Sequence, residues 1–139
     1  MKVRERAAVQ DETEKTSSRI LDMLGVKGEV TQPGSMILAC SGYESGEKVN
    51  RARHPWSLYK VPYADLEKAM DRLRAELPKN GWTIVKDGVT ESQAKRPQVV
   101  AESEGREFAV DVRLHKADPA RNQSAFMEVT VESACFRAK

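Results

Sequence analysis

The chain of 139 residues has few of the residues that carry recognisable chemistry. It contains 2 cysteines, 2 histidines and an aromatic fraction of 6%. Its longest stretch without a charged side chain, residues 30–43, is interrupted by Pro33, Gly34 and Gly42. A membrane-spanning helix needs about 20 mainly apolar residues. The sequence therefore predicts no transmembrane helix.

Motifs for metal, nucleotide or nucleophile chemistry are also missing. His54, His115 and the two cysteines show no paired spacing of the C-x-x-C or H-x-x-x-H kind, which a structural zinc site needs. No G-x-x-x-x-G-K-[ST] loop occurs, and the glycines at 25 and 28 lack the third glycine of a dinucleotide fingerprint. We therefore expect no metal, no cofactor and no enzymatic activity.

Charge of one sign does not dominate. The 23 Lys and Arg residues exceed the 21 Asp and Glu residues by +2, too little for the phosphate neutralisation that supplies most nucleic-acid affinity. We expect no nucleic-acid partner. A length of 139 residues fits one domain, which we place at residues 12–139. The polar residues 1–11 are interpreted as a flexible tether, and no apolar signal-peptide segment follows their charged start.

Hydrophobic periodicity predicts two helices. The clearer one covers residues 64–77 and is expected to end before Pro78, because proline cannot continue a helix. Its apolar face has the i, i+3, i+4, i+7 spacing and consists of Leu66, Ala69, Met70, Leu73 and Leu77. The other helix is predicted at residues 12–24, with Gly25 as a left-handed C-terminal cap.

The rest of the chain predicts strands. Inward residues alternate with polar ones at Val110, Val112 and Leu114, and again at Met127, Val129 and Val131. The continuously apolar residues 36–39 predict a central strand. The predicted strands are residues 35–41, 56–61, 82–86, 98–102, 106–115 and 125–136, and the long loops are 42–53 and 116–124. The fold class is α+β, an antiparallel sheet of four to six strands packed on one face by two helices.

The two cysteines permit two interpretations. Cys40 ends the first predicted core strand, and Cys135 has the inward parity of Met127, Val129 and Val131. A disulfide between them would close a loop of roughly 95 residues, stabilise the fold by about 4 kcal/mol and require an oxidising compartment. The alternative is two buried free thiols, since cysteine is often buried.

One basic cluster interleaved with aromatic residues is a candidate surface for a ligand or partner protein. It lies in and just after the predicted loop at 42–53, where a solvated segment could meet an anionic partner. Its members are Lys48, Arg51, Arg53, His54, Trp56 and Tyr59. The alternative is an ordinary solvated loop, because Glu44 and Glu47 precede the cluster and the tryptophan could enter the core.

Four features together resemble a known family. They are the segment HPWSLYKVP at residues 54–62, the helix over 64–77, the Gly81-Trp82 pair and the final segment ESACF at 132–136. From about residue 17 onward the chain resembles the mature domains of small actinobacterial extracytoplasmic lipoproteins. The resemblance implies an α+β domain outside the cytoplasm whose two cysteines are bridged. It also implies a lipidated N-terminal anchor that is absent from this chain, and it assigns no catalytic residue.

The sequence thus predicts a non-enzymatic extracytoplasmic domain of the bacterial envelope, membrane-anchored or secreted, that binds a protein or a small ligand. One alternative is a cytosolic immunity or adaptor-type interaction module with reduced cysteines. Another is a small enzyme or carrier with a ligand cavity between helix and sheet, which would need a sizeable pocket with convergent polar groups.

Overall fold

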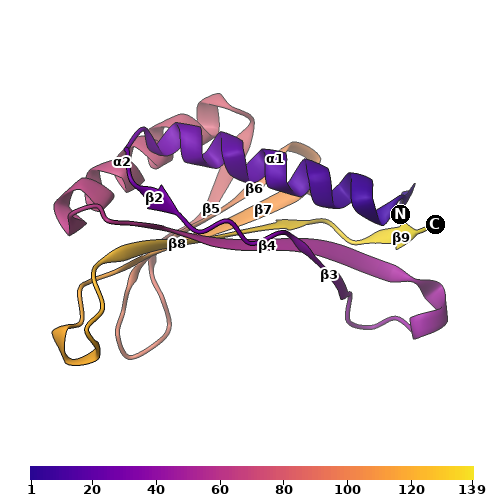
Figure 1. Cartoon of the computed structure of the whole chain (residues 1–139). Coiled ribbons are helices and arrows are strands. Elements are labelled where there is room, and N and C mark those ends of the chain that lie inside the picture. The colour runs from indigo at the N-terminus through magenta and orange to yellow at the C-terminus, as the bar shows by residue number, and fades with distance from the viewer.

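Both predicted helices form and lie on the same face of one sheet in the computed structural model, which describes residues 1–139 (Figure 1). The helices are α1 (Arg6–Leu24) and α2 (Tyr63–Lys79). The strands are β1 (Val3–Arg4), β2 (Glu29–Val30), β3 (Met36–Ala39), β4 (Val49–Tyr59), β5 (Trp82–Val89), β6 (Pro97–Ser103), β7 (Phe108–His115), β8 (Phe126–Ser133) and β9 (Phe136–Ala138). Three 3-10 helices lie in the connections: η1 (Ser45–Glu47), η2 (Glu104–Arg106) and η3 (Pro119–Arg121).

The sheet is mixed but mostly antiparallel, and it has more strands than the four to six predicted. Seven of its nine strands follow the order β1-β9-β4-β8-β7-β6-β5, and β2 and β3 both pair with β4. Only β1 and β9 run parallel. The sequence did not reveal β1, β2 or β9, because two or three residues are too few for a period of two to be visible. The α+β class and the helices on one face are confirmed.

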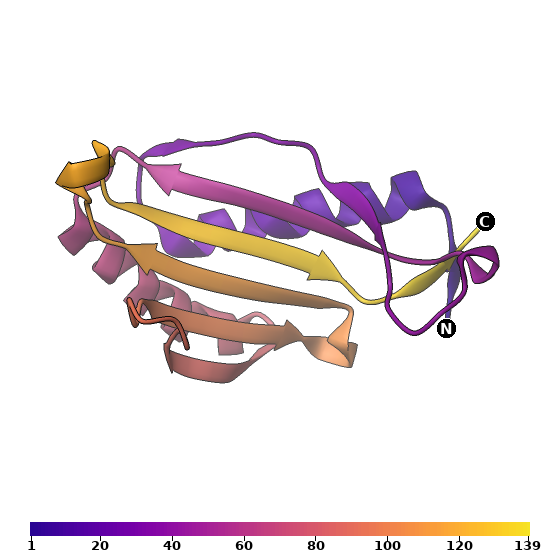
Figure 2. The same cartoon turned by 90° about the horizontal axis from the view of Figure 1, so that it is seen from below.

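The consecutive strands β5, β6, β7 and β8 form an antiparallel meander beside the long strand β4 (Figure 2). Their predicted alternation is confirmed. The side chains of Val110, Val112, Met127, Val129 and Val131 are all buried in the main core cluster. The helices cover this face of the sheet, so the opposite face carries the polar residues of each strand.

Helix α2 contributes the face that its periodicity predicts. Leu66, Ala69, Met70, Leu73 and Leu77 are all buried against the sheet. The expectation that the helix ends before Pro78 is wrong by two residues, since α2 includes Pro78 and ends at Lys79. The proline lies in the last turn, so no further turn follows it.

Helix α1 begins earlier than predicted. It starts at Arg6 instead of residue 12, and it ends as predicted, with Gly25 in the left-handed conformation at φ 61°. Residues 1–11, interpreted from the sequence as a tether, therefore supply β1 and the first turns of α1. The N–H of Arg137 in β9 donates to the carbonyl of Lys2 at 2.9 Å, so the segment is hydrogen-bonded to the sheet.

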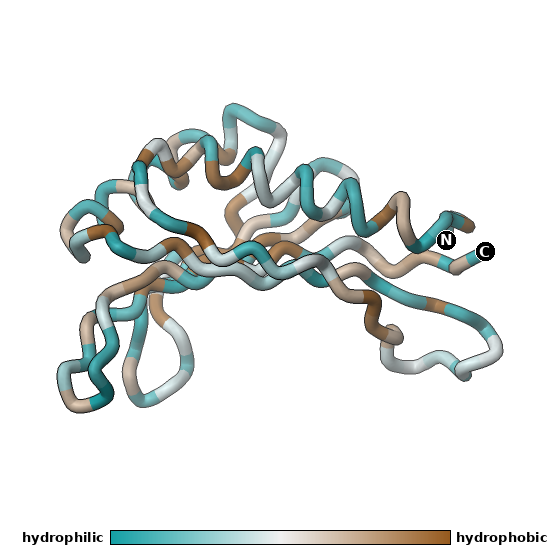
Figure 3. Tube along the Cα trace, viewed as in Figure 1, coloured by the Kyte–Doolittle hydropathy of each residue, from teal (hydrophilic) through white to brown (hydrophobic).

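The predicted loop at 42–53 is wrong in its second half. Residues 49–53 belong to β4, where Arg53 pairs with Met36 and Asn50 with Ala39 of β3. The charged side chains at alternate positions of this segment lie on the open face of the strand. In the sequence the same charges had favoured a loop. The central position predicted for residues 36–39 is also wrong, because β3 pairs with β4 alone. Figure 3 shows this hydrophobic run toward one end of the molecule, and its Ile37 packs against the small cluster that contains Val9 of α1.

Cys40 and Cys135 form a disulfide, 95 residues apart in sequence. Cys40 follows β3, and its N–H donates to the carbonyl of Val49 at 3.0 Å. Cys135 lies between β8 and β9 and is exposed, so its predicted inward orientation is wrong. The alternation stops where β8 ends at Ser133. The bridge thus ties the segment after β3 to the junction of the last two strands.

Candidate ligand-binding groove

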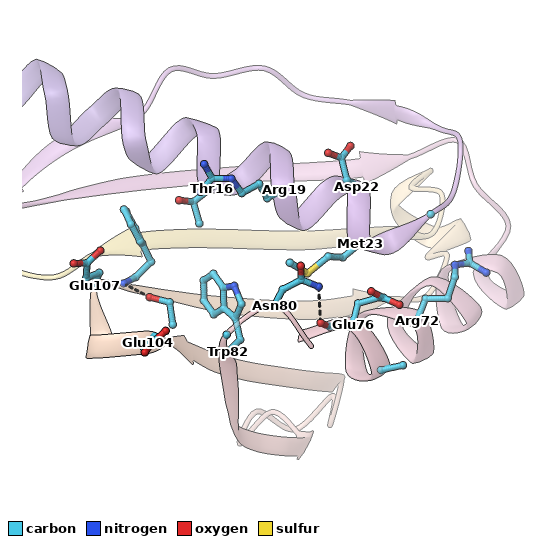
Figure 4. A pocket seen from close by; sticks show the side chains of 15 residues that line it. Thr16, Arg19, Asp22, Met23, Arg72, Glu76, Asn80, Trp82, Glu104 and Glu107 are labelled. Atoms are coloured by element: carbon cyan, nitrogen blue, oxygen red, sulfur yellow. Dashed lines mark hydrogen bonds between the residues drawn. The ribbon is translucent and has the colours of Figure 1, made fainter. Parts of the chain in front are cut away.

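A hollow with a volume of about 740 Å³ lies between α1 and the C-terminal half of α2 (Figure 4). Its position follows from how the helices meet. Nε of Arg72 in α2 donates to the carbonyl of Leu24 at the end of α1, at 2.8 Å. Away from this contact the helices leave part of the sheet end uncovered, where Trp82, Ser103 and Phe108 form the floor. We call this hollow the interhelical groove.

Trp82 is the main apolar group of the groove. It begins β5, directly after the Asn80-Gly81 turn that follows α2, and its side chain is 8% exposed. Figure 4 shows the indole rising from the strand into the space between α1 and the turn at Glu104. None of the hydrogen bonds drawn there reaches its ring nitrogen. Most of the indole packs in the core, so the groove exposes only its edge to a ligand.

The rim of the groove is more acidic than basic. Four carboxylates surround it, those of Asp22, Glu76, Glu104 and Glu107, against the guanidinium groups of Arg19 and Arg72. Glu107 contacts Lys2 at 3.6 Å and Glu76 contacts Lys79 at 3.8 Å. Asp22 and Glu104 belong to none of the ion pairs in the structure. These two carboxylates are free to pair with a ligand.

The six residues of the predicted basic and aromatic surface are not brought together, because five of them lie on alternate faces of β4. Arg51 and Arg53 point to the open face, where their Nε atoms contact the carboxylate of Glu132 at 3.4 and 3.2 Å. The half-buried Tyr59 has the same parity. Lys48 is the left-handed residue that ends η1, just before the strand.

His54 and Trp56 point to the helix-covered face instead. Trp56 is 5% exposed within the core, and its buried Nε1 has no hydrogen-bond partner. His54 is held by two contacts, Nε2 with the carbonyl of Pro33 at 2.8 Å and Nδ1 with Oγ of Ser17 at 2.7 Å. Because a carbonyl only accepts, Nε2 carries a proton, and in the neutral ring Ser17 donates to Nδ1.

The other histidine is held on the open face. Nε2 of His115 contacts Oε1 of Glu128 at 2.7 Å, and its ring stacks on Phe126 with centroids 4.2 Å apart. No group of three or more His, Cys, Asp and Glu side chains is placed to hold a metal ion. Arg113 is hydrogen-bonded to Asp111 on the same face. This bond raises the pKa of the Arg113 guanidinium.

The sequence did not reveal the interhelical groove. Its walls come from both helices, the start of β5 and the turn between β6 and β7, which are separated by up to about 90 residues. The one local signal was Trp82, a large aromatic residue immediately after a turn. It predicted only the start of a strand.

Comparison of the chain with protein-family models, with curated proteins and with solved structures found no match. None of its helices combines the length and apolar character needed to cross a membrane.

Proposed function

We propose that the chain is a non-enzymatic, extracytoplasmic envelope domain that binds a cationic group of a small ligand or partner protein in the interhelical groove. The observation that carries this proposal is that Trp82 lines the same hollow as Asp22 and Glu104, two carboxylates without an ion-pair partner. A volume of about 740 Å³ is within the range of small-molecule sites.

The chemistry of the groove favours a cation that also has an apolar body. The apolar body would pack against the exposed edge of the Trp82 indole. Charge-assisted hydrogen bonds to Asp22 and Glu104 would orient the cation. Arg19, which has no ion pair either, would repel a second cation on its side and attract an acceptor group of the ligand. A peptide with a basic side chain supplies both the cation for the two carboxylates and an acceptor group for Arg19.

The disulfide supports the extracytoplasmic part of the proposal. Structural disulfides persist in oxidising compartments and are rare in the cytosol. The bond between Cys40 and Cys135 therefore favours the envelope domain over a cytosolic interaction module with reduced cysteines. The resemblance to lipoproteins leads to the same compartment.

The engagement of reactive side chains supports a binding role over catalysis. Both cysteines are in the disulfide, and both histidines are committed to contacts with Ser17, Pro33 or Glu128. A carrier would use the same groove, so it differs from the proposed function only in whether the ligand is later released to another protein.

The test is a titration of the oxidised protein with two probes, spermidine and a tetralysine peptide, followed by amide chemical shifts. We expect shifts at Trp82, Glu104 and Phe108, with the indole N–H of Trp82 included. The double variant Asp22→Asn/Glu104→Gln should bind about tenfold more weakly or worse. The matched control is Glu44→Gln/Glu91→Gln, which removes two exposed carboxylates that lie outside the groove.

Shifts confined to other regions, or an equal loss of affinity in the two double variants, would overturn the proposed groove. Full alkylation of the native protein without reductant would overturn the extracytoplasmic part.

A further inference from the structure

A second hollow, of about 700 Å³, lies at the other end of the molecule and has the opposite charge. It is bounded by the first turns of α2, the loop between β5 and β6, and the loop between β7 and β8. Figure 1 shows both loops extending from the same end of the sheet, on the side away from the helices. We call this hollow the hairpin pocket.

Cations outnumber carboxylates in the hairpin pocket. Lys95, Arg96, Lys116 and Arg121 line it. Arg121 is paired with Asp118 at 3.6 Å, and the ammonium of Lys116 lies 5.8 Å from the ring centroid of Tyr63. Lys95 and Arg96 belong to none of the ion pairs. The carboxylates that line it are those of Asp118 and Glu67, so the net charge of +2 for the whole chain conceals a basic pocket and an acidic groove.

The loop between β5 and β6 holds its two cations in a defined place. The N–H of Thr90 donates to the carbonyl of Arg96 at 2.8 Å, and the N–H of Arg96 returns a bond to Oγ1 of Thr90 at 3.1 Å. Thr90 is 5% exposed. Lys95 has the left-handed φ of 47°, which costs free energy for a residue with a Cβ and is common at binding sites.

The loop between β7 and β8 is fixed in a similar way. Asp118 and Gln123 exchange two backbone hydrogen bonds, of 2.8 and 3.0 Å. This bridge closes a turn that contains Arg121 and begins two residues after Lys116. Little ordering is then needed when a ligand binds, which favours affinity.

Tyr63 adds a neutral donor to the wall. It is the first residue of α2, so the positive end of the helix dipole is at this pocket. Burial, and secondarily the charge of Glu67, raise the pKa of the Tyr63 hydroxyl, which keeps its proton available for donation.

We propose that the hairpin pocket binds a phosphate group through Lys95, Arg96 and Lys116. Cations from two separate loops surround one hollow, an arrangement that suits the several oxygens of a tetrahedral anion better than a planar carboxylate. The fork of Arg96 can donate two parallel bonds to two of those oxygens. The phosphate could be free in solution or part of an anionic lipid headgroup, and the chemistry of the pocket is the same for both.

The experiment measures binding of pyrophosphate by calorimetry and binding of vesicles by co-sedimentation, both at low ionic strength because salt screens these charges. One set of vesicles contains phosphatidylglycerol, and the reference set contains only phosphatidylcholine. The triple variant Lys95→Gln/Arg96→Gln/Lys116→Gln is compared with Arg6→Gln/Lys27→Gln/Lys68→Gln. The control removes the same charge from exposed cations outside the hairpin pocket.

We expect the first triple variant to lose more than about tenfold in affinity and the control less than about threefold. Binding of pyrophosphate assigns the pocket to soluble phosphates, whereas binding of phosphatidylglycerol vesicles alone assigns it to lipid headgroups. Amide shifts of Lys95, Arg96 and Lys116 in the wild type locate the site even if the triple variant fails to fold.

The proposal is overturned if neither probe binds, if both triple variants lose affinity equally, or if the shifts occur elsewhere. The groove experiment uses cationic probes and a distant set of residues, so either proposal can fail without the other.

Discussion

Nε of Arg72 donates a hydrogen bond to the carbonyl oxygen of Leu24 at 2.8 Å, and through it α2 caps the C-terminus of α1. The last carbonyls of a helix have no partner within the helix. A guanidinium at this end also interacts favourably with the helix dipole. Arg72 thereby sets where the two helices meet and where the interhelical groove begins.

Replacing Arg72 by methionine should lower the free energy of unfolding by about 1–2 kcal/mol, because a hydrogen bond from a charged donor is lost while the apolar stem is kept. Urea unfolding measures the change. Lys68→Met is the control, since Lys68 is exposed on the same helix and makes no ion pair. Equal stability of the two variants would show that the contact with Leu24 contributes little.

Gly28 has no room for a side chain. A Cβ at this position would lie 2.4 Å from Cγ2 of Val61 and 2.9 Å from Cδ1 of Leu58. We expect Gly28→Ala to destabilise the fold by about 1–3 kcal/mol through overpacking. At Gly34 a Cβ meets nothing within 4 Å, so Gly34→Ala should be neutral or slightly stabilising. Thermal unfolding of the two variants compares them, and a similar Tm would contradict the predicted clash.

The disulfide between Cys40 and Cys135 encloses most of the chain, with a separation of 95 residues. Its removal in Cys40→Ser/Cys135→Ser should lower the free energy of unfolding by about 4 kcal/mol, because the unfolded chain gains conformational freedom. Urea unfolding with and without a thiol reductant measures this. The reductant should destabilise the wild type and leave the double variant unchanged, and a response of the variant would indicate another cause.

The sequence predicted the helices and strands in which a hydrophobic pattern repeats several times along one continuous segment. The face of α2 from Leu66 to Leu77 and the alternation around Val110 and Val129 were visible because a helix or strand repeats its burial pattern several times. The strand β4 was half missed, since the environment of Arg51 and Arg53 is decided by Glu132, about 80 residues away.

Sequence patterns did not reveal either candidate site, because each site is formed by segments that lie far apart in the chain. Lys95, Lys116 and Tyr63 share a hollow only because the sheet brings two hairpin loops beside the start of α2. The basic cluster that is contiguous in sequence, around Arg53 and His54, is divided instead between the two faces of a strand. Successive side chains of a strand point to opposite faces of the sheet, so residues that cluster in the sequence of a strand do not form one surface.

Tyr63 should titrate at higher pH than an ordinary tyrosine. Burial disfavours its phenolate, and the negative charge of Glu67 adds to the effect, so the pKa lies above the ordinary 10.0. The stabilising effect of the neutral hydroxyl is complete below pH 10.0 and is lost as the pH rises through the folded-state pKa. Phenolate absorbance of the wild type and of Tyr63→Phe identifies the late titration, which the variant should lack.

Glu67→Gln tests the second cause of this shift. It should lower the pKa of Tyr63 only part of the way, because burial is the larger cause and remains. The control, Glu91→Gln, removes an exposed carboxylate outside the hairpin pocket and should leave the titration unchanged. If both variants titrate like the wild type, the charge of Glu67 does not reach the Tyr63 hydroxyl, and burial alone raises its pKa.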